Sequence, residues 1–343
     1  MKIDDRFFRL VRDFLLIYLP KNRCCSQNTV KAYRDTIHLL QVFMKEQKRV
    51  PFAKITFDRL NHALVSEFLD WLQTERKCRV STRNHRLAAL KSFFKYAAQE
   101  DASLMFAYVE LGKVPVKRQP GRRVSYMSES GLAALLQEPD EGTKRGIRDR
   151  FFMIFLYDTG ARIQEVLDLQ LGDLHLKDSV PCVYLTGKRQ KTRVVPLLNK
   201  TLQHLELYLQ HFHPKEAYSS NNSLFYTVIN GKTGKMSPDN VASFLKRYGA
   251  SARLRCSEVP ERVYPHLFRH TRAMHLYQSG MPLSYIKDFL GHASVNTTDI
   301  YASADVSMLK AALERTYVNG DIRPEIPVWE DNEELLLHLC GLQ

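Results

Sequence analysis

The chain has 343 residues, which is enough for two domains of ordinary size with sizeable cores. Hydrophobic residues make up 44% and charged residues 25%, the balance of a soluble globular protein. No uninterrupted apolar stretch is long enough to span a bilayer, so we expect no membrane partner. The six cysteines form no CxxC pair and fit no common zinc spacing, so we expect no zinc site. Six cysteines in a chain of this length do not make a disulfide framework, so we expect a cytoplasmic protein.

The formal net charge of +13 is concentrated in the first third of the chain. Residues 1–120 contain 23 Lys and Arg against 12 Asp and Glu, whereas the rest contains 27 against 25. Nucleic acid favours clustered cations, because binding them releases counterions from the phosphates. A membrane surface is the rival partner, but the basic residues are spread over several expected helices and not gathered beside one anchor.

Apolar residues that recur every three or four positions predict helices over residues 26–46, 61–75 and 81–99. In the last of these, four cations lie off the expected apolar stripe. They are Arg83, Arg86, Lys91 and Lys95. Each one alone fits a solvated helix face, but together, in the most basic part of the chain, they are candidate phosphate contacts.

Residues 111–127 interrupt the helical pattern with two prolines, two glycines and five Lys or Arg. We interpret this segment as an interdomain linker that can follow a DNA backbone, with Arg122 and Arg123 as candidate contacts. The expected domains are then a helical one over residues 1–110 and a second one over residues 128–316.

The second domain is expected to be mostly helical. Residues 182–197 predict two short strands around a basic turn. Further helices are expected over residues 198–212, 238–253, 265–279, 282–290 and 303–316. Residues 317–343 form a tail, in which 329–342 could form a final amphipathic helix. The fold class is therefore mainly α, with a small β-sheet or hairpin.

Four clusters in the second domain contain residue types suited to phosphate chemistry. They are YDTGARIQEV with Arg162, TGKRQKTRVVPL with Lys188, PHLFRHTRAMH with His266 and Arg269, and LGHASVNTTDIYA with His292 and Tyr301. Short motifs often match by chance, so one cluster alone is weak. All four together, in this order, are a strong signal.

Over residues 20–316 the chain resembles the tyrosine recombinase (phage integrase) family. That family has an arginine in a TG-x-R turn, a lysine in a hairpin GK turn, an H-x-x-R motif, and LGH before a nucleophilic tyrosine. The resemblance implies a helical core-binding domain, an α/β catalytic domain, and DNA cleavage and rejoining through a 3′-phosphotyrosine. The implied catalytic residues are Arg162, Lys188, His266, Arg269, His292 and Tyr301.

The chemistry of phosphodiester cleavage agrees with these roles. Negative charge develops on a pentacoordinate phosphorus, and the guanidinium groups of Arg162 and Arg269 could stabilise it through paired hydrogen bonds. Tyr301 would attack the phosphorus, and its unperturbed pKa of about 10 requires positive surroundings or a base. His266 is the candidate base, and His292 would donate a hydrogen bond to a non-bridging oxygen.

Several alternatives stay open at this point. Each arginine could instead bind phosphate without a catalytic role, or pair with a carboxylate such as Glu165. Lys188 could protonate the departing 5′-oxygen. However, Arg189 follows it where the family often has glycine, so Lys191 could hold that role. Arg189 and Lys191 are also candidate DNA contacts, because a basic turn that only binds DNA is a third interpretation.

The spacing of His266 and His270 also fits two metal ligands on a helix. No further ligand pattern accompanies this pair, and Arg269 between them disfavours a cation. We therefore expect no metal, and His270 and His275 are expected to be structural. The sequence contains no P-loop and no GxGxxG, so no cofactor is expected either.

The resemblance implies double-stranded DNA with specific recombination sites as the partner, a homotetramer on DNA that passes through a Holliday junction, and accessory recombination proteins. The reaction would be integration, excision or resolution of a mobile element or replicon. One alternative is strand relaxation of the type IB topoisomerase kind, which uses the same chemistry. The other is a DNA-binding protein without activity, against which the intact set of six residues argues.

Overall fold

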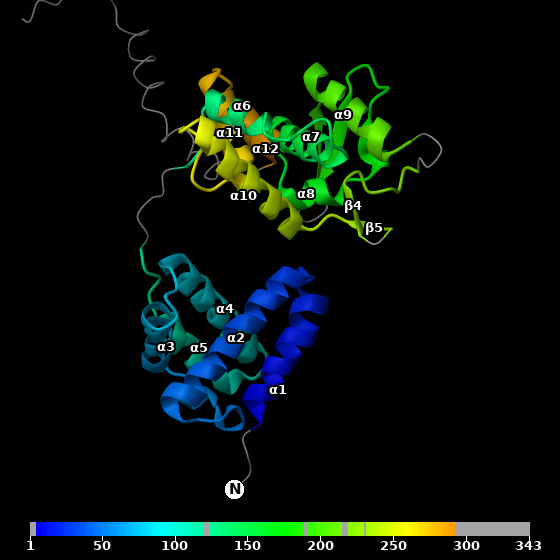
Figure 1. The fold of residues 1–343 in the computed structure, drawn as a ribbon. Helices are drawn as coiled ribbons and strands as arrows, with labels where there is room; N and C mark the ends of the chain where they lie inside the picture. The colour runs from blue at the N-terminus through cyan, green and yellow to red at the C-terminus, as the bar shows by residue number, and fades with distance from the viewer. Residues whose placement is uncertain (1–4, 119–123, 188–190, 215–218, 230, 292–343) are drawn as a thin grey trace, which may run out of the picture. The chain divides into compact units, whose positions relative to one another are not determined.

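The computed structural model describes residues 5–118, 124–187, 191–214, 219–229 and 231–291. The chain divides into two compact units, Met1–Arg122 and Arg123–Gln343, which are described separately (Figure 1). The expected helices at 303–316 and 329–342 lie outside the described residues. No helix of the described part is long and apolar enough to cross a bilayer.

The first unit is helical, as predicted. Ser26 accepts a hydrogen bond from the Thr29 amide and so caps the long second helix. The helices of this unit are α1 (Arg6–Asp13) with a π-helical continuation (Phe14–Asn22), α2 (Gln27–Lys48), α3 (His62–Thr74), α4 (Val80–Glu100) and α5 (Met105–Gly112).

Aromatic rings fill the core of the first unit. Phe93, on α4, lies with its ring centroid 5.3–5.9 Å from those of Phe7, Phe14 and Phe57. Edge-to-face and offset ring contacts add to the gain from burying apolar surface. This cluster holds the N-terminal helix against α4.

Two cations of α4 bind the segment that follows α5. Arg83 Nη1 donates to the carbonyl of Pro115 at 3.0 Å, and Lys91 Nζ donates to that of Val114 at 2.8 Å. Arg83 is only 2% exposed, so the prediction that it lies on the solvated face of the helix is wrong. Carbonyls at and beyond a helix end lack intrahelical partners, which explains why these side chains turn inward.

The other two cations of α4 differ from each other. Arg86 Nη1 donates to the carbonyl of Ala32 at 2.8 Å and thereby joins α4 to α2. Lys95 is exposed. DNA contact stays a prediction for all four cations, and Lys95 is the one whose side chain extends into solvent. Arg122 and Arg123 lie outside the described residues.

The second unit is mostly helical with two small antiparallel sheets. Its helices are α6 (Glu129–Leu136), α7 (Lys144–Thr159), α8 (Ile163–Asp168), α9 (Asn199–Phe212), α10 (Pro238–Arg255), α11 (Pro265–Gln278) and α12 (Leu283–Leu290). The strands β1 (Leu174–His175), β2 (Cys182–Thr186) and β3 (Thr192–Pro196) form one sheet in that order. The strands β4 (Tyr226–Ile229) and β5 (Lys232–Lys235) form a separate hairpin.

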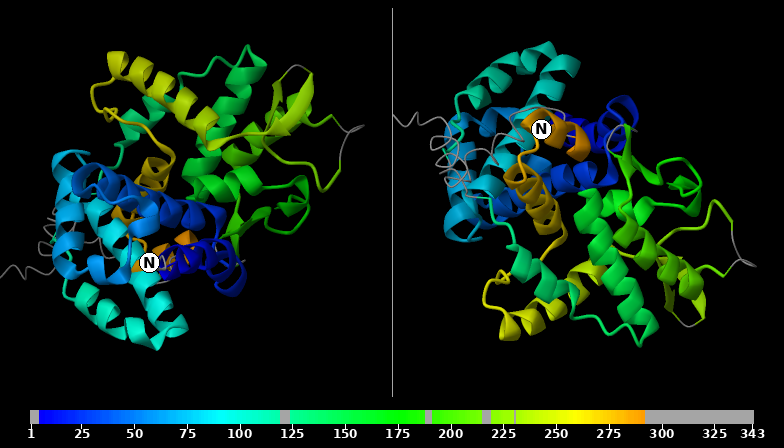
Figure 2. Two further views of the ribbon diagram at one scale, coloured as in Figure 1. Left: turned by 90° about the horizontal axis from the view of Figure 1, so that it is seen from below. Right: turned by 90° about the horizontal axis from the view of Figure 1, so that it is seen from above.

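The core of the second unit is built around α7, which packs against α9 and α11 (Figure 2). Phe151, Phe152 and Phe155 of α7 are at most 1% exposed. Because α7 is buried from Phe151 to Leu156, the residues that follow it start from a firmly packed element. The predicted helices from 198 to 290 and the strands within 182–197 are confirmed.

The β4–β5 hairpin was not expected from the sequence. All four residues of β5 are exposed, so this strand has no alternation of apolar and polar residues. Strand prediction depends on that alternation, which appears only where one face is buried.

The chain enters the second unit through contacts with α11. The Met127 amide donates to Thr271 Oγ1 at 3.0 Å, and its carbonyl lies 2.9 Å from His275 Nε2. His275 Nδ1 lies 2.8 Å from the hydroxyl of Tyr157. Burial lowers the pKa of His275, so the neutral ring fits this arrangement, with one nitrogen donating and the other accepting. These contacts agree with the structural role expected for His275.

Replacing Arg83 by alanine should lower the free energy of unfolding by about 1–3 kcal/mol, because the buried Arg83 side chain no longer packs on α4 and no longer donates to the carbonyl of Pro115. Urea unfolding of the full chain measures this. The exposed Lys95 on the same helix is the matched control, and Lys95→Ala should change stability by less than about 0.5 kcal/mol. Equal effects of the two substitutions would contradict the inference that Arg83 stabilises the unit by binding the segment after α5.

Candidate active site

The C-terminal end of α12 is the place where several predicted site residues meet. Its last three carbonyls have no partners within the helix. Each accepts a hydrogen bond from a different arginine, and each arginine comes from a different element. The pairs are Arg193 Nε with Phe289 at 3.0 Å, Arg269 Nη2 with Leu290 at 2.6 Å, and Arg162 Nη2 with Gly291 at 3.2 Å.

Arg162 is placed by a tight turn at the end of α7. Gly160 has φ 56°, and a side chain there would lie 2.9 Å from Leu290 Cδ2, so the position favours glycine. Glu165 then holds Arg162 at two points. Its Oε2 accepts from the Arg162 amide at 2.9 Å, and its Oε1 accepts from Arg162 Nη1 at 2.7 Å. The Arg162 side chain is 30% exposed, so it remains accessible to a ligand.

Glu165 is a buried carboxylate shared by two guanidinium groups. Its side chain is 3% exposed, and its Oε2 also accepts from Arg193 Nη2 at 2.8 Å. Burial by itself would raise the pKa of Glu165. The hydrogen bond and charge of Arg193, and then the backbone and side-chain hydrogen bonds of Arg162, outweigh burial and lower this pKa to about 2. Glu165 is therefore ionised at neutral pH.

The β2–β3 hairpin packs the end that carries its turn against Glu165. The Gly187 amide donates to the carbonyl of Lys191 at 2.9 Å and closes the turn. A Cβ at Gly187 would lie 2.8 Å from Glu165 Oε1, so the two touch directly. Lys191 is exposed. Lys188 and Arg189 lie outside the described residues, although Lys188 directly follows Gly187.

Helix α11 contributes Arg269, which is 3% exposed. Arg269 Nη1 donates to the carbonyl of Gly160 at 2.6 Å, so its guanidinium bridges the end of α7 and the end of α12. His266 precedes Arg269 by three residues and is exposed at the start of the same helix. Residues three apart on a helix are neighbours on one face.

His270 lies half-buried on α11, directly after Arg269. Within the described ranges, no three His, Cys, Asp or Glu side chains are grouped as metal ligands. Burial is the main reason why the pKa of His270 is lowered, and the charges of His266 and Arg269 add to this. A neutral, half-buried ring agrees with the structural role expected for His270.

The structure thus brings Arg162, Arg269 and the turn end of the β2–β3 hairpin together at the end of α12. His292 follows Gly291 directly, but His292 and Tyr301 lie outside the described residues. The sequence motifs did not assign a role to Arg193. The only hint in the sequence was that Arg193 lies just after the basic turn. In the structure, Arg193 is opposite Leu185 in the β2–β3 pair.

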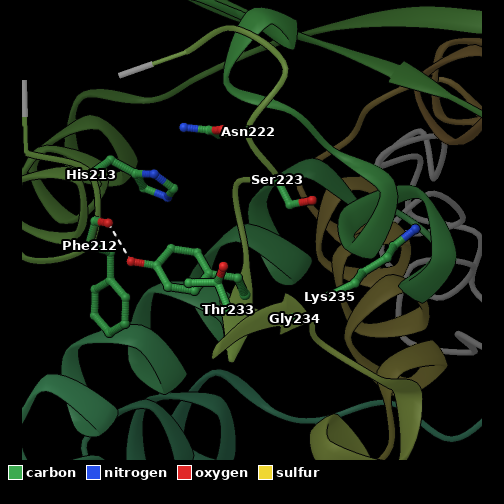
Figure 3. A pocket seen from close by; sticks show the side chains of 8 residues that line it. Phe212, His213, Asn222, Ser223, Thr233, Gly234 and Lys235 are labelled. Atoms are coloured by element: carbon green, nitrogen blue, oxygen red, sulfur yellow. Dashed lines mark hydrogen bonds between the residues drawn. The ribbon is translucent and has the colours of Figure 1, made fainter. Parts of the chain in front are cut away.

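A separate cavity of about 290 Å³ lies beside the β4–β5 hairpin (Figure 3). Among its lining residues, Tyr226 donates its hydroxyl hydrogen to the carbonyl of Phe212 at 2.5 Å, and His213 Nε2 lies 2.8 Å from the carbonyl of Leu224. Burial lowers the pKa of His213. These contacts hold the end of α9 against β4 and the residues before it.

Comparison with known proteins finds matches to both units of the chain. Residues 125–308 match the phage integrase family, and residues 13–101 match the phage integrase N-terminal SAM-like domain. A putative integrase/recombinase y4rC of Sinorhizobium fredii is 32% identical over 308 residues, which are 90% of each chain. A tyrosine recombinase XerC of Pelotomaculum thermopropionicum is 27% identical over 311 residues, 89% of this chain and 97% of the relative.

Two solved structures share the fold. One is the XerH site-specific recombinase in a post-cleavage complex with palindromic difH substrate, with a TM-score of 0.66 and 21% identity, covering 92% of this chain and 89% of that one. The other is the Tn1549 transposon integrase in complex with transposon right end DNA, with a TM-score of 0.66 and 18% identity, covering 93% and 100%.

Glu165→Gln should destabilise the fold more at pH 7 than at pH 2. The folded-state pKa of about 2 lies below the usual 4.5, so ionised Glu165 stabilises the folded chain. This contribution is fully present above about pH 4.5 and is lost as the pH falls through about 2. A shift of this size corresponds to roughly 3 kcal/mol.

Urea unfolding at several pH values between 7 and 2 measures this difference. Glu206→Gln, which changes an exposed carboxylate on α9, is the control and should change stability by less than about 0.5 kcal/mol at pH 7. If the cost of Glu165→Gln were the same at pH 7 and pH 2, the ionised pair would not be the source of the stability.

Proposed function

Because this chain belongs to the phage integrase family, we propose that it is a site-specific DNA recombinase that cleaves and rejoins DNA through a 3′-phosphotyrosine at Tyr301. One observation carries the proposal. Arg162 and Arg269, which lie in separate sequence motifs, converge on one helix end. From that end the chain continues directly to His292 and, nine residues later, to Tyr301.

Two arginines suit the charge that develops during cleavage. A phosphodiester under attack carries negative charge on its non-bridging oxygens, and guanidinium groups stabilise it through paired hydrogen bonds. Arg162 retains exposed surface beyond its contacts with Glu165 and Gly291. Arg269 donates to the carbonyls of Gly160 and Leu290, which fixes its guanidinium at the end of α12, where Arg162 also binds.

The proposed step is a transesterification. Tyr301 Oη attacks phosphorus, and the bond from phosphorus to the 5′-oxygen breaks. His266 accepts the phenol proton, while Lys188, or Lys191 as the alternative, donates a proton to the departing 5′-oxygen. A 5′-hydroxyl of the partner duplex reverses the step, and the bond energy is conserved. His292 donates a hydrogen bond to a non-bridging oxygen.

DNA is the partner that this proposal requires. The surplus of cations in the first third of the chain supports it, because phosphate binding is driven largely by counterion release. The XerH recombinase was solved with palindromic difH substrate, and the Tn1549 integrase with transposon right end DNA. We further propose a homotetramer on two recombination sites, a Holliday-junction intermediate, and integration, excision or resolution of a mobile element or replicon.

Tyr301→Phe should abolish the covalent adduct and leave DNA affinity nearly unchanged, because only the nucleophilic oxygen is lost. The assay is trapping on a nicked suicide substrate made from the ends of the element that encodes the chain, followed by mapping of the modified tyrosine. Relaxation of supercoiled DNA without these ends would indicate activity of the topoisomerase kind. An adduct formed by the phenylalanine variant would assign the nucleophile to another residue.

Arg162→Ala should lower the single-turnover rate of cleavage by about 10²–10³-fold, the range for losing one donor to a developing oxyanion. Arg162→Lys keeps the charge without the forked donors and should be intermediate. Both rates are measured at saturating protein, with DNA affinity determined in parallel. Unaltered cleavage by the alanine variant would remove Arg162 from the active site.

A further inference from the structure

We infer that Arg193 is a positioning residue for strand cleavage, which holds the β2–β3 hairpin, Glu165 and the end of α12 in a single arrangement. The inference rests on the function proposed for Arg162 and the turn lysines. Arg193 lies within the TGKRQKTRVVPL cluster, but the sequence assigned it no role of its own, and the role inferred here follows from its contacts.

Arg193 makes hydrogen bonds in two directions. Its Nη2 donates to Glu165 Oε2 at 2.8 Å, and its Nε donates to the carbonyl of Phe289 at 3.0 Å. Its side chain is 13% exposed, so these contacts are largely shielded from water. A Cβ at Gly291 would lie 3.2 Å from Arg193 Cδ, so the aliphatic part of the side chain packs against the residue before His292.

These contacts require a guanidinium group. A planar guanidinium carries donors at fixed angles, so one side chain can bind a carboxylate and a carbonyl together. A lysine at this position would keep the charge beside Glu165, but its single ammonium would have to serve both acceptors from one point. A glutamine would supply neither the charge nor the fork.

Arg193 also governs how Glu165 binds Arg162. The two carboxylate oxygens of Glu165 bind different guanidinium groups, since Oε1 accepts from Arg162 and Oε2 accepts from Arg193. Without Arg193, Oε2 would be a buried charged acceptor whose remaining donor is the Arg162 amide. The Arg162 guanidinium would then be drawn toward a forked pair with Glu165, and fewer of its donors would face a phosphate.

The same side chain connects two segments whose ends lead to proposed catalytic groups. Gly187, against Glu165, is followed by the turn that contains Lys188 and precedes Lys191. Phe289 lies three residues before His292. Because Arg193 binds both Glu165 and Phe289, it sets the distance between the origin of the turn and the origin of the His292–Tyr301 segment. We therefore class it as a positioning residue and not as a phosphate ligand.

The test compares Arg193→Gln and Arg193→Lys in the full chain on the nicked suicide substrate. At saturating protein, we expect the rate of covalent adduct formation to fall about 100-fold in the glutamine variant and about 10-fold in the lysine variant, with DNA affinity within about threefold of wild type. Arg255→Gln is the matched control. It removes another arginine–carboxylate pair of the same unit, with Glu138, and its rate should stay within about twofold of wild type.

A second measurement tests the path through Glu165. Combining Arg193→Gln with Glu165→Gln should slow cleavage by much less than the product of the two single effects, because both changes disturb the same support of Arg162. If the glutamine variant does not fold, Arg193→Lys and its combination with Glu165→Gln decide the question instead.

Wild-type rates in the Arg193 variants overturn the inference, as does a loss of rate that is matched by an equal loss of DNA affinity. Fully multiplicative effects of the two substitutions also overturn it. The wild-type chain distinguishes the levels of failure. If the wild type forms no adduct, the proposed function fails and the inference falls with it, whereas normal wild-type cleavage beside normal variants overturns the inference alone.

Discussion

The rest of the site depends on one constraint, which is that the last carbonyls of α12 must find hydrogen-bond donors. A helix end leaves these groups unpaired, and they are costly to bury without a partner. Here three arginines from α11, β3 and the turn after α7 satisfy three successive carbonyls. The same hydrogen bonds that complete the helix therefore gather cationic side chains in one place. Completing the C-terminal end of α12 and gathering the arginines therefore depend on the same hydrogen bonds.

Concentrating three guanidinium groups has an electrostatic cost, and Glu165 offsets part of it. This carboxylate is almost fully buried and binds two of the three arginines. It compensates positive charge inside the protein, while part of the Arg162 side chain remains exposed. Arg269 is stabilised differently, because carbonyl dipoles of Gly160 and Leu290 surround it. Glu165 and the two carbonyls thus compensate the positive charge of the arginines on the side that faces the protein interior. The exposed part of Arg162 stays cationic, which is what the proposed phosphodiester ligand requires.

The basic first unit illustrates the difference between charge and binding surface. Its surplus of cations favours association with DNA at long range. Several of these cations nevertheless make hydrogen bonds within the protein. Arg83 and Lys91 tie the segment after α5 to α4, and Arg86 ties α4 to α2. Counting cations therefore overestimates the number of available phosphate contacts, whereas exposure identifies side chains such as Lys95.

The sequence by itself determined the mainly helical class, the strands within 182–197, the helices from residue 198 to 290 and the order of the motifs, because periodicity and motif spacing are local properties of the chain. It did not predict the β4–β5 hairpin, whose second strand is exposed throughout and so carries no alternating pattern. Only the tertiary structure decided that Arg83 is buried, that Glu165 is shared, and that Arg193 belongs to the site. Those outcomes depend on carbonyl and carboxylate partners, many of them distant in the chain, and residue type alone does not encode which acceptor an arginine will find.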